Sequence, residues 1–373
     1  MDGVKDGATA GATTGMTGDL LTGLWFAEPP PHWSLRDWED VLGQARQCRL
    51  QARLATLFVD RAWMGDVAAG PAVYLRNALR AGERQRREVL WEIDRLEAAL
   101  SGVDTPVVVL KGAAYLIGEL PAARGRLFSD IDIMVARDRL EDAERALFAA
   151  GWIPEKHDAY DERYYREWMH ELPPLRHVQR GTFVDMHHTI TPPTSRYRVA
   201  GSQLLSRARP VKPGSRLQVL APEDMLLHSA VHLMQEGDFN AGLRDLLDMS
   251  DLLTHFEQQP DFWPTLLARA AELGLGAPLG QMLAQIRIIR GKDWPDSLRT
   301  DISRLNGRSA SARVLQGMLS IATRPHHPSC NRPCSPMVRW LLYVRSHLVR
   351  MPLHLVVPHL LRKAYLRRFP QKV

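Results

Sequence analysis

The sequence predicts an α+β (mixed α/β) protein, in which a small mixed sheet is flanked by an N-terminal helical extension and a larger C-terminal helical domain. Three observations lead to this prediction. Val107-Val108-Val109-Leu110 is an apolar run with β-branched residues, as in a strand buried on both faces. Asp130 to Val135 alternates polar and apolar residues, which is the period of a second strand. Before residue 106 and from residue 222 onward, apolar residues recur at helical spacing.

Length and composition limit the class of protein. The chain has 373 residues, 45% hydrophobic and 24% charged, which excludes a mostly disordered chain or a fibre. Three cysteines exclude a disulfide scaffold and indicate a reducing compartment. We see no secretory signal and no apolar run of about 20 residues that would form a transmembrane segment. We therefore expect a cytoplasmic protein, with an alternative location at the inner membrane surface.

The chain divides by composition into five predicted segments. They are a disordered leader and Pro-rich connector (1–30), an N-terminal helical region (31–105), a catalytic core (106–220), a C-terminal helical domain (221–322) and a basic amphipathic segment (323–373).

Elements are predicted within these segments in order. Helices are expected over 35–58 and 71–100. In the core we expect a strand over 107–110, a short helix over 113–119, a loop over 121–126, a strand over 130–135, a helix over 138–150, and one or two strands within 172–190. Gly181 is expected at a turn between the last two. Helices follow over 225–235, 243–255, 261–322 and 336–368, the last broken or kinked by Pro352 and Pro358.

Charge is unevenly distributed along the chain. The net charge is +6, but residues 324–373 hold ten Lys or Arg and no Asp or Glu. We favour a packed helix whose basic side chains extend outward into solvent. Peripheral contact with an anionic membrane or with an RNA backbone is the alternative for this tail.

The residues that indicate chemistry are two aspartates on the second strand. Asp130 and Asp132 share one face because side chains alternate along a strand, and neighbouring carboxylates are best tolerated beside a divalent cation. Asp185, in Val-Asp-Met-His-His on a plausible neighbouring strand, offers a third carboxylate. Such a set suits Mg²⁺, with Mn²⁺ as the alternative ion, in a two-metal site acting on an NTP. The competing interpretation is an Asp-x-Asp pair at an exposed strand edge without function.

These motifs resemble a known family. Leu-Lys-Gly at 110–112, Arg-x-x-Ser-Asp-Ile-Asp at 126–132 and Val-Asp-Met-His-His at 184–188 are similar to the polymerase-β-type nucleotidyltransferase superfamily. More narrowly, they resemble its uncharacterised nucleotidyltransferase family, some members of which accompany exosortase and exopolysaccharide systems. The Leu-Lys-Gly-Ala-Ala start is also similar to abortive-infection nucleotidyltransferase toxins. The resemblance covers about residues 107–190.

The resemblance implies a role for each matching residue. Asp130, Asp132 and Asp185 would be catalytic and would bind the metals, with Asp185 helping to deprotonate the acceptor hydroxyl. The nucleotide-binding residues would be Lys111, Gly112, Arg126 and Ser129, because they would contact the triphosphate. The substrate would be an NTP, and the acceptor (a sugar, an RNA end, a protein or a small molecule) is left open.

Some features depart from the family or stay open. Gly112-Ala113 stands where the family usually has Gly-Ser or Gly-Gly. This departure supports one alternative, a catalytically silent member that binds a nucleotide or a partner. The other alternative is a toxin-like enzyme that modifies tRNA or another RNA. Lys111 is equally compatible with capping the turn or pairing with a surface acid. We interpret His228 and His232 as core or cleft histidines, and favour a structural role for Asp248 over nucleotide binding.

Overall fold

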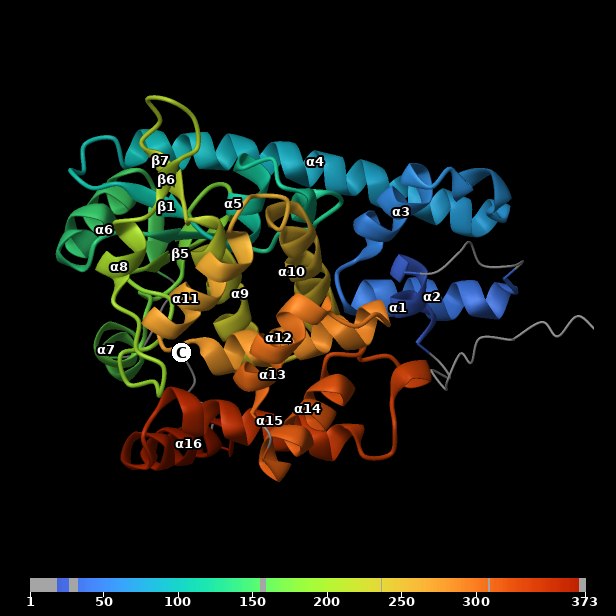
Figure 1. Ribbon diagram of the computed structural model, residues 1–373. Coiled ribbons are helices and arrows are strands. Elements are labelled where there is room, and N and C mark those ends of the chain that lie inside the picture. Colours follow the sequence, from blue (N-terminus) through green and yellow to red (C-terminus); the bar gives the residue numbers. More distant parts are fainter. Residues whose placement is uncertain (1–18, 27–32, 155–158, 236, 308, 369–373) are drawn as a thin grey trace, which may run out of the picture.

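The computed structural model describes residues 19–26, 33–154, 159–235, 237–307 and 309–368 (Figure 1). The predicted leader, 1–18, and residues 27–32 of the connector lie outside these residues. The described chain is mixed α/β, with one seven-stranded sheet and many helices, as the sequence predicts.

The sheet is mixed, and its strand order is β3-β4-β5-β2-β1-β7-β6. β2 lies at its centre, antiparallel to β1 and parallel to β5. β7 is parallel to β1, while the pairs at either edge are antiparallel. The strands are β1 (Val107–Val109), β2 (Ile131–Met134), β3 (Trp152–Pro154), β4 (Leu175–His177), β5 (Phe183–His187), β6 (Arg209–Pro210) and β7 (Leu217–Val219).

The strands expected over 107–110, 130–135 and 172–190 are confirmed. Gly181 lies between β4 and β5 with φ of +71°, a left-handed conformation that glycine adopts without steric cost. β3, β6 and β7 were not predicted, because each has only two or three residues and forms no readable alternation.

Eight α-helices precede α9 in the described chain. The long α4 runs along one side of the molecule, with α1–α3 grouped at one end of it and α6 and α8 near the strands at the other end (Figure 1). The helical segment expected over 35–58 is two helices, since Arg49 adopts a left-handed φ of 56° and turns the chain. These helices are α1 (Leu20–Phe26), α2 (Leu35–Gln47), α3 (Gln51–Asp60), α4 (Ala69–Ala99), α5 (Lys111–Ile117), α6 (Leu140–Ala149), α7 (Ala159–Trp168) and α8 (Gly201–Leu205).

From Pro222 onward the described chain is helical, as expected. Pro352 separates α15 from α16, and Pro358 lies inside α16. The helices are α9 (Pro222–Gln235), α10 (Gly242–Phe256), α11 (Phe262–Glu272), α12 (Gly276–Arg290), α13 (Asp296–Asn306), α14 (Ala310–Ala322), α15 (Ser335–Arg350) and α16 (Leu353–Arg368).

Two hydrophobic clusters form the core. The larger contains buried residues from Val89 to Leu342, and so includes the sheet and most of the C-terminal helices. The smaller joins α1–α4 to Leu243 and Leu247 of α10. α10 therefore connects the N-terminal helices to the rest of the molecule. The division into five segments stays a prediction. No helix among the described residues is long and apolar enough to cross a membrane.

Candidate active site

The sheet brings two of the three aspartates together. In the parallel β2–β5 pair, Asp132 lies directly opposite Asp185. Asp130 precedes β2 and is exposed, whereas Asp132 is buried rather than lying on an open face. Because side chains alternate along both strands, the apolar Ile133 and Met186 occupy the opposite, buried face. The register of this strand pair thus determines the distance between the carboxylates.

Lys111 enters the site from the first turn of α5. Its φ is 47°, an uncommon conformation for a residue with a side chain, and its Nζ donates a hydrogen bond of 2.7 Å to Oδ1 of Asp132. Burial lowers the pKa of Lys111, but the negative charges of Asp132 and Glu171 raise it above its ordinary value overall. The structure thus pairs Lys111 with an acid, but this acid is the buried Asp132 of the site and not a surface residue.

The buried Asp132 has a second donor. His187 Nε2 donates to the same Oδ1 at 3.0 Å and lies 3.5 Å from Oε2 of Glu171. Burial alone would raise the pKa of Asp132, but Lys111 and His187 hold it well below its usual range. Oδ2 of Asp132 accepts no hydrogen bond from the described residues, so this oxygen remains open to a ligand.

Asp185 is in the opposite electrostatic situation. Burial, followed by the charges of Asp132, Glu171 and Asp130, raises the pKa of Asp185 to about 7. None of the described residues donates a hydrogen bond to its carboxylate. Ser129 Oγ donates to Oδ1 of Asp130 at 2.8 Å. Neighbouring carboxylates that repel one another are the ligands that a hard divalent cation prefers, so Asp130, Asp132 and Asp185 fit Mg²⁺ or Mn²⁺.

A histidine-containing group lies beside these carboxylates. The ligand-type atoms of His170, Glu171 and His187 all lie within 4.8 Å of one another. A set with two imidazoles suits a softer ion than Mg²⁺. His187 already donates to Asp132, however, so its Nε2 is engaged. The oxygen-only set is therefore the better fit to the ion that the sequence predicts.

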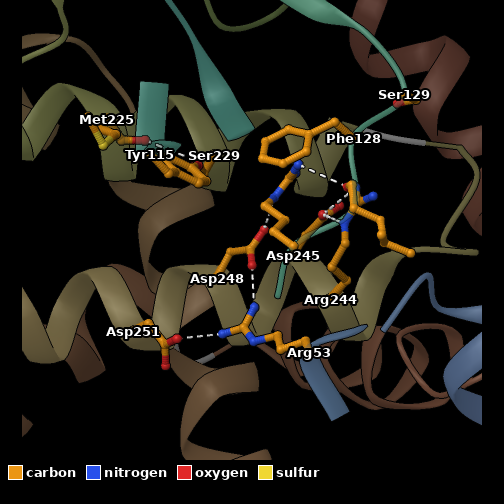
Figure 2. A network of polar contacts seen from close by, with 12 residues as sticks. Arg53, Tyr115, Phe128, Ser129, Met225, Ser229, Arg244, Asp245, Asp248 and Asp251 are labelled. Carbon is orange, nitrogen blue, oxygen red and sulfur yellow. Dashed lines mark hydrogen bonds and ion pairs between the residues drawn. The ribbon is translucent and has the colours of Figure 1, made fainter. Parts of the chain in front are cut away.

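Arg126 is held beside Gly112 by a buried ion-pair network. Its Nε donates to Oδ2 of Asp248 at 2.8 Å, and its Nη2 has no hydrogen-bond partner among the described residues. A Cβ on residue 112 would lie 2.0 Å from Arg126 Nη1, so only glycine leaves room for this guanidinium. Asp248 also pairs with Arg53 of α3, which reaches Asp251 at 2.5 Å (Figure 2). Asp248 thus has the structural role favoured from the sequence.

One cavity of about 290 Å³ is lined by all seven predicted site residues: Lys111, Gly112, Arg126, Ser129, Asp130, Asp132 and Asp185. Three residues that the sequence did not identify as site residues also line it: Glu171, His232 and Arg244. The structure brings the predicted residues together but does not test their roles. Three larger cavities of about 680, 590 and 360 Å³ lie elsewhere. Among their described lining residues, the first has no carboxylate and the other two have one each, Asp138 and Asp293.

The three additional residues reach the cavity through tertiary structure. Glu171 lies outside the named strands and forms an isolated bridge with His187. His232 of α9 has a pKa well below its ordinary value because it is buried and close to Lys111. Arg244 of α10 pairs with Asp245 at 2.7 Å. The cavity therefore has carboxylates on the sheet side and guanidinium groups from the loop and α10.

Comparison with known proteins assigns the chain to a family. Residues 34–291, more than half of the chain, match the model of a family described as an uncharacterised nucleotidyltransferase. No match was found among curated proteins. The matched range extends beyond the sheet and includes α3 and α10, which carry Arg53 and Asp248.

Proposed function

The chain belongs to this family of nucleotidyltransferases, and from that premise we propose that it transfers an NMP from an NTP to an acceptor hydroxyl and releases pyrophosphate. One observation carries the proposal. Three aspartates converge with Lys111, Arg126 and Arg244 around a single cavity. Anionic oxygens suit metal ions, and the cationic groups suit the phosphates that accompany them. We place the reaction in the cytoplasm, where the NTP substrate is available.

The carboxylates would hold the metal ions. Asp130, Asp132 through its open Oδ2, and Asp185 would bind Mg²⁺, which would supply charge neutralisation at the transferring phosphate and activation of the attacking hydroxyl. Lys111 and His187 fix the orientation of Asp132 by binding its other oxygen. Glu171 adds a fourth negative charge at the cavity wall.

The cationic side of the cavity would bind the triphosphate. Arg126, in the loop before β2, lines the cavity, and its Nε donates to Asp248. Its Nη2, which binds none of the described residues, would donate to a phosphate. The absence of a Cβ at Gly112 lets this guanidinium lie against the start of α5. Ser129 and Lys111 would add a hydroxyl and an ammonium at the same edge. Arg244 would contact the phosphates from α10, across the cavity from the sheet.

In the proposed reaction, the acceptor oxygen attacks the α-phosphorus. A new O–P bond forms, the bond between the α-phosphorus and the bridging oxygen of pyrophosphate breaks, and the hydroxyl proton passes to a carboxylate, for which we propose Asp185. The protein contributes mainly positioning and electrostatic stabilisation. Sugars, RNA ends, proteins and small molecules all carry suitable hydroxyls.

A labelling screen tests the proposal. Wild-type protein and Asp130→Asn are incubated with each α-labelled NTP, Mg²⁺ and a cell lysate. We expect a labelled product with the wild type and a loss of at least about 1,000-fold in the variant, because a metal ligand is removed from the exposed position without disturbing the core. The product's size then identifies the acceptor class, and a labelled tRNA would establish the toxin-like alternative. Labelling that is unchanged by Asp130→Asn would contradict the proposal, and Mg²⁺-dependent NTP binding without any product would favour the silent member.

A further inference from the structure

Two histidines and a glutamate lie together beside the three aspartates, and the proposed reaction does not use them as metal ligands. We call His170, Glu171 and His187 the His-Glu-His cluster. Its ligand-type atoms all lie within 4.8 Å of one another. The side chain of His187 is fully buried, and those of His170 and Glu171 are 13% and 22% exposed. The cluster is thus enclosed by protein but open on one side to the cavity that Glu171 lines.

Backbone pairing holds the cluster in place. Glu171 and His187, the last residue of β5, form an antiparallel bridge. Backbone hydrogen bonds of 2.8 and 2.9 Å join the same two segments on either side of this bridge. Opposite residues of an antiparallel pair direct their side chains to the same face. The sheet therefore brings the carboxylate and one imidazole together before any ligand binds.

The distances within the cluster suit ligands of one ion better than hydrogen bonds. Oε2 of Glu171 lies 3.5 Å from Nε2 of His187 and 3.8 Å from Nε2 of His170. An N–H···O hydrogen bond spans about 2.7–3.2 Å. Around a tetrahedral ion with bonds of about 2.0–2.1 Å, neighbouring ligand atoms are about 3.3–3.4 Å apart. Both of these separations therefore reach the values of a metal site through shifts of a few tenths of an ångström.

The hydrogen bond from His187 to Asp132 leaves this position open to an ion. The ion would replace the Nε2 hydrogen between the two residues, and Oδ1 of Asp132, 3.0 Å from that nitrogen, would become a fourth ligand. The ring hydrogen would then lie on Nδ1, which is buried without a partner in the described chain, as is Nδ1 of His170. Ligating histidines usually donate from this second nitrogen, and losing that partner weakens binding by about 10–100-fold. We therefore expect an ion that exchanges with solution.

We propose that the His-Glu-His cluster binds a divalent transition-metal ion of the Zn²⁺ type, next to the Mg²⁺ ligands and sharing Asp132 with them. Imidazole nitrogens favour Zn²⁺ over Mg²⁺, which takes oxygen ligands. The ion would add two positive charges to a cavity lined by four carboxylates, those of Asp130, Asp132, Asp185 and Glu171. The site follows from the cluster itself and holds whether or not the chain transfers nucleotides.

Equilibrium dialysis of the full chain against Zn²⁺, with Mg²⁺ in excess, tests the proposal. The excess Mg²⁺ occupies the oxygen-only set, so we expect the wild type to bind one Zn²⁺ per chain at the cluster. His170→Ala and the isosteric Glu171→Gln should each weaken Zn²⁺ binding by at least about tenfold, because each removes one ligand. His255→Ala, at a half-buried histidine of α10 outside the cluster, is the matched control and should bind like the wild type. Asp130→Asn should also keep its Zn²⁺, because Asp130 is not a member of the cluster.

Three results would overturn the proposal. They are no Zn²⁺ bound by the wild type in excess Mg²⁺, unchanged affinity in both His170→Ala and Glu171→Gln, and loss of Zn²⁺ in Asp130→Asn with retention in His170→Ala. The last result would assign the ion to the oxygen-only set. Circular dichroism of each variant verifies its fold. No nucleotide is present, so the proposed transferase activity and this site can fail independently of each other.

Discussion

Replacing Asp248 with alanine tests the network that holds Arg126. Asp248 is buried and accepts hydrogen bonds from two guanidinium groups, those of Arg53 and Arg126. Truncation leaves two buried cations without this carboxylate. Arg53 keeps Asp251 at 2.5 Å, whereas the next acceptor for Arg126 is the carbonyl of Leu127 at 3.5 Å, which is a weak contact. The charge of Arg53 is therefore still compensated by a carboxylate, whereas the charge of Arg126 is not.

The loss of folding stability can be estimated from this difference between Arg53 and Arg126. Removing one partner of a buried ion pair costs about 3–5 kcal/mol, and the retained Asp251 favours the lower end, about 3 kcal/mol. With an unfolding entropy of about 2.1 cal/mol/K per residue over 373 residues, this loss lowers the melting temperature by about 4 °C. The control is Asp251→Ala, whose carboxylate is 37% exposed and pairs with Arg53, so it should cost about 1 kcal/mol or less.

Calorimetry and urea unfolding of wild type, Asp248→Ala and Asp251→Ala measure these losses. If Arg126 binds the triphosphate, Asp248→Ala should also raise the KM for NTP by about tenfold while kcat changes less, because a positioned donor is lost rather than a reacting group. A stability within about 1 kcal/mol of the wild type, or a larger loss in Asp251→Ala, would refute the network argument irrespective of activity.

Two further predictions concern the cavity. In EDTA, the contribution of Asp185 to the stability of the wild type should fall as pH rises from about 4 to 7, because folded Asp185 keeps its proton until about pH 7 whereas the unfolded carboxyl releases it near 3.8. The comparison of wild type with Asp185→Asn isolates this contribution, since buried histidines such as His232, whose pKa is lowered, act in the opposite direction. Asp185→Asn should therefore exceed the wild type by about 2–4 kcal/mol at pH 8 in urea unfolding, with the exposed Asp130→Asn as control, and equal stabilities would contradict this. Gly112→Ala should cost about 1–3 kcal/mol and raise the KM for NTP, because its Cβ meets Arg126. Gly102→Ala, in open space, should do neither, and a fully active, stable Gly112→Ala protein would disprove the close contact.

The sequence predicted the centre of the sheet because its strands carry readable patterns. β1 is an apolar run, β2 alternates, and a glycine turn separates β4 from β5. Those patterns also place Asp132 and Asp185 on strands, but the register that puts them opposite each other is a property of the sheet. β3, β6 and β7, with two or three residues each, are too short to show an alternation of polar and apolar side chains.

The remaining cavity residues could not be found from sequence spacing. Glu171 lies outside the named strands and reaches the site through a bridge to His187. Arg244 belongs to a helix more than a hundred residues after β2, and it pairs with its sequence neighbour Asp245. The partnership of Arg53 with Asp248 joins residues 195 positions apart, so it is determined by the packing of α3 against α10.

The β2–β5 register determines where the protein tolerates an inserted or deleted residue. A single inserted or deleted residue within β5 would exchange the two faces of the strand, turning Val184 or Met186 toward the site and burying Asp185 in the core. The described part of the chain between the two strands contains three helical segments and two further strands, and its connections can change length without this exchange. Natural variants of this chain should therefore differ in length between residues 135 and 174, while the four residues of β2 and the five of β5 stay constant in number.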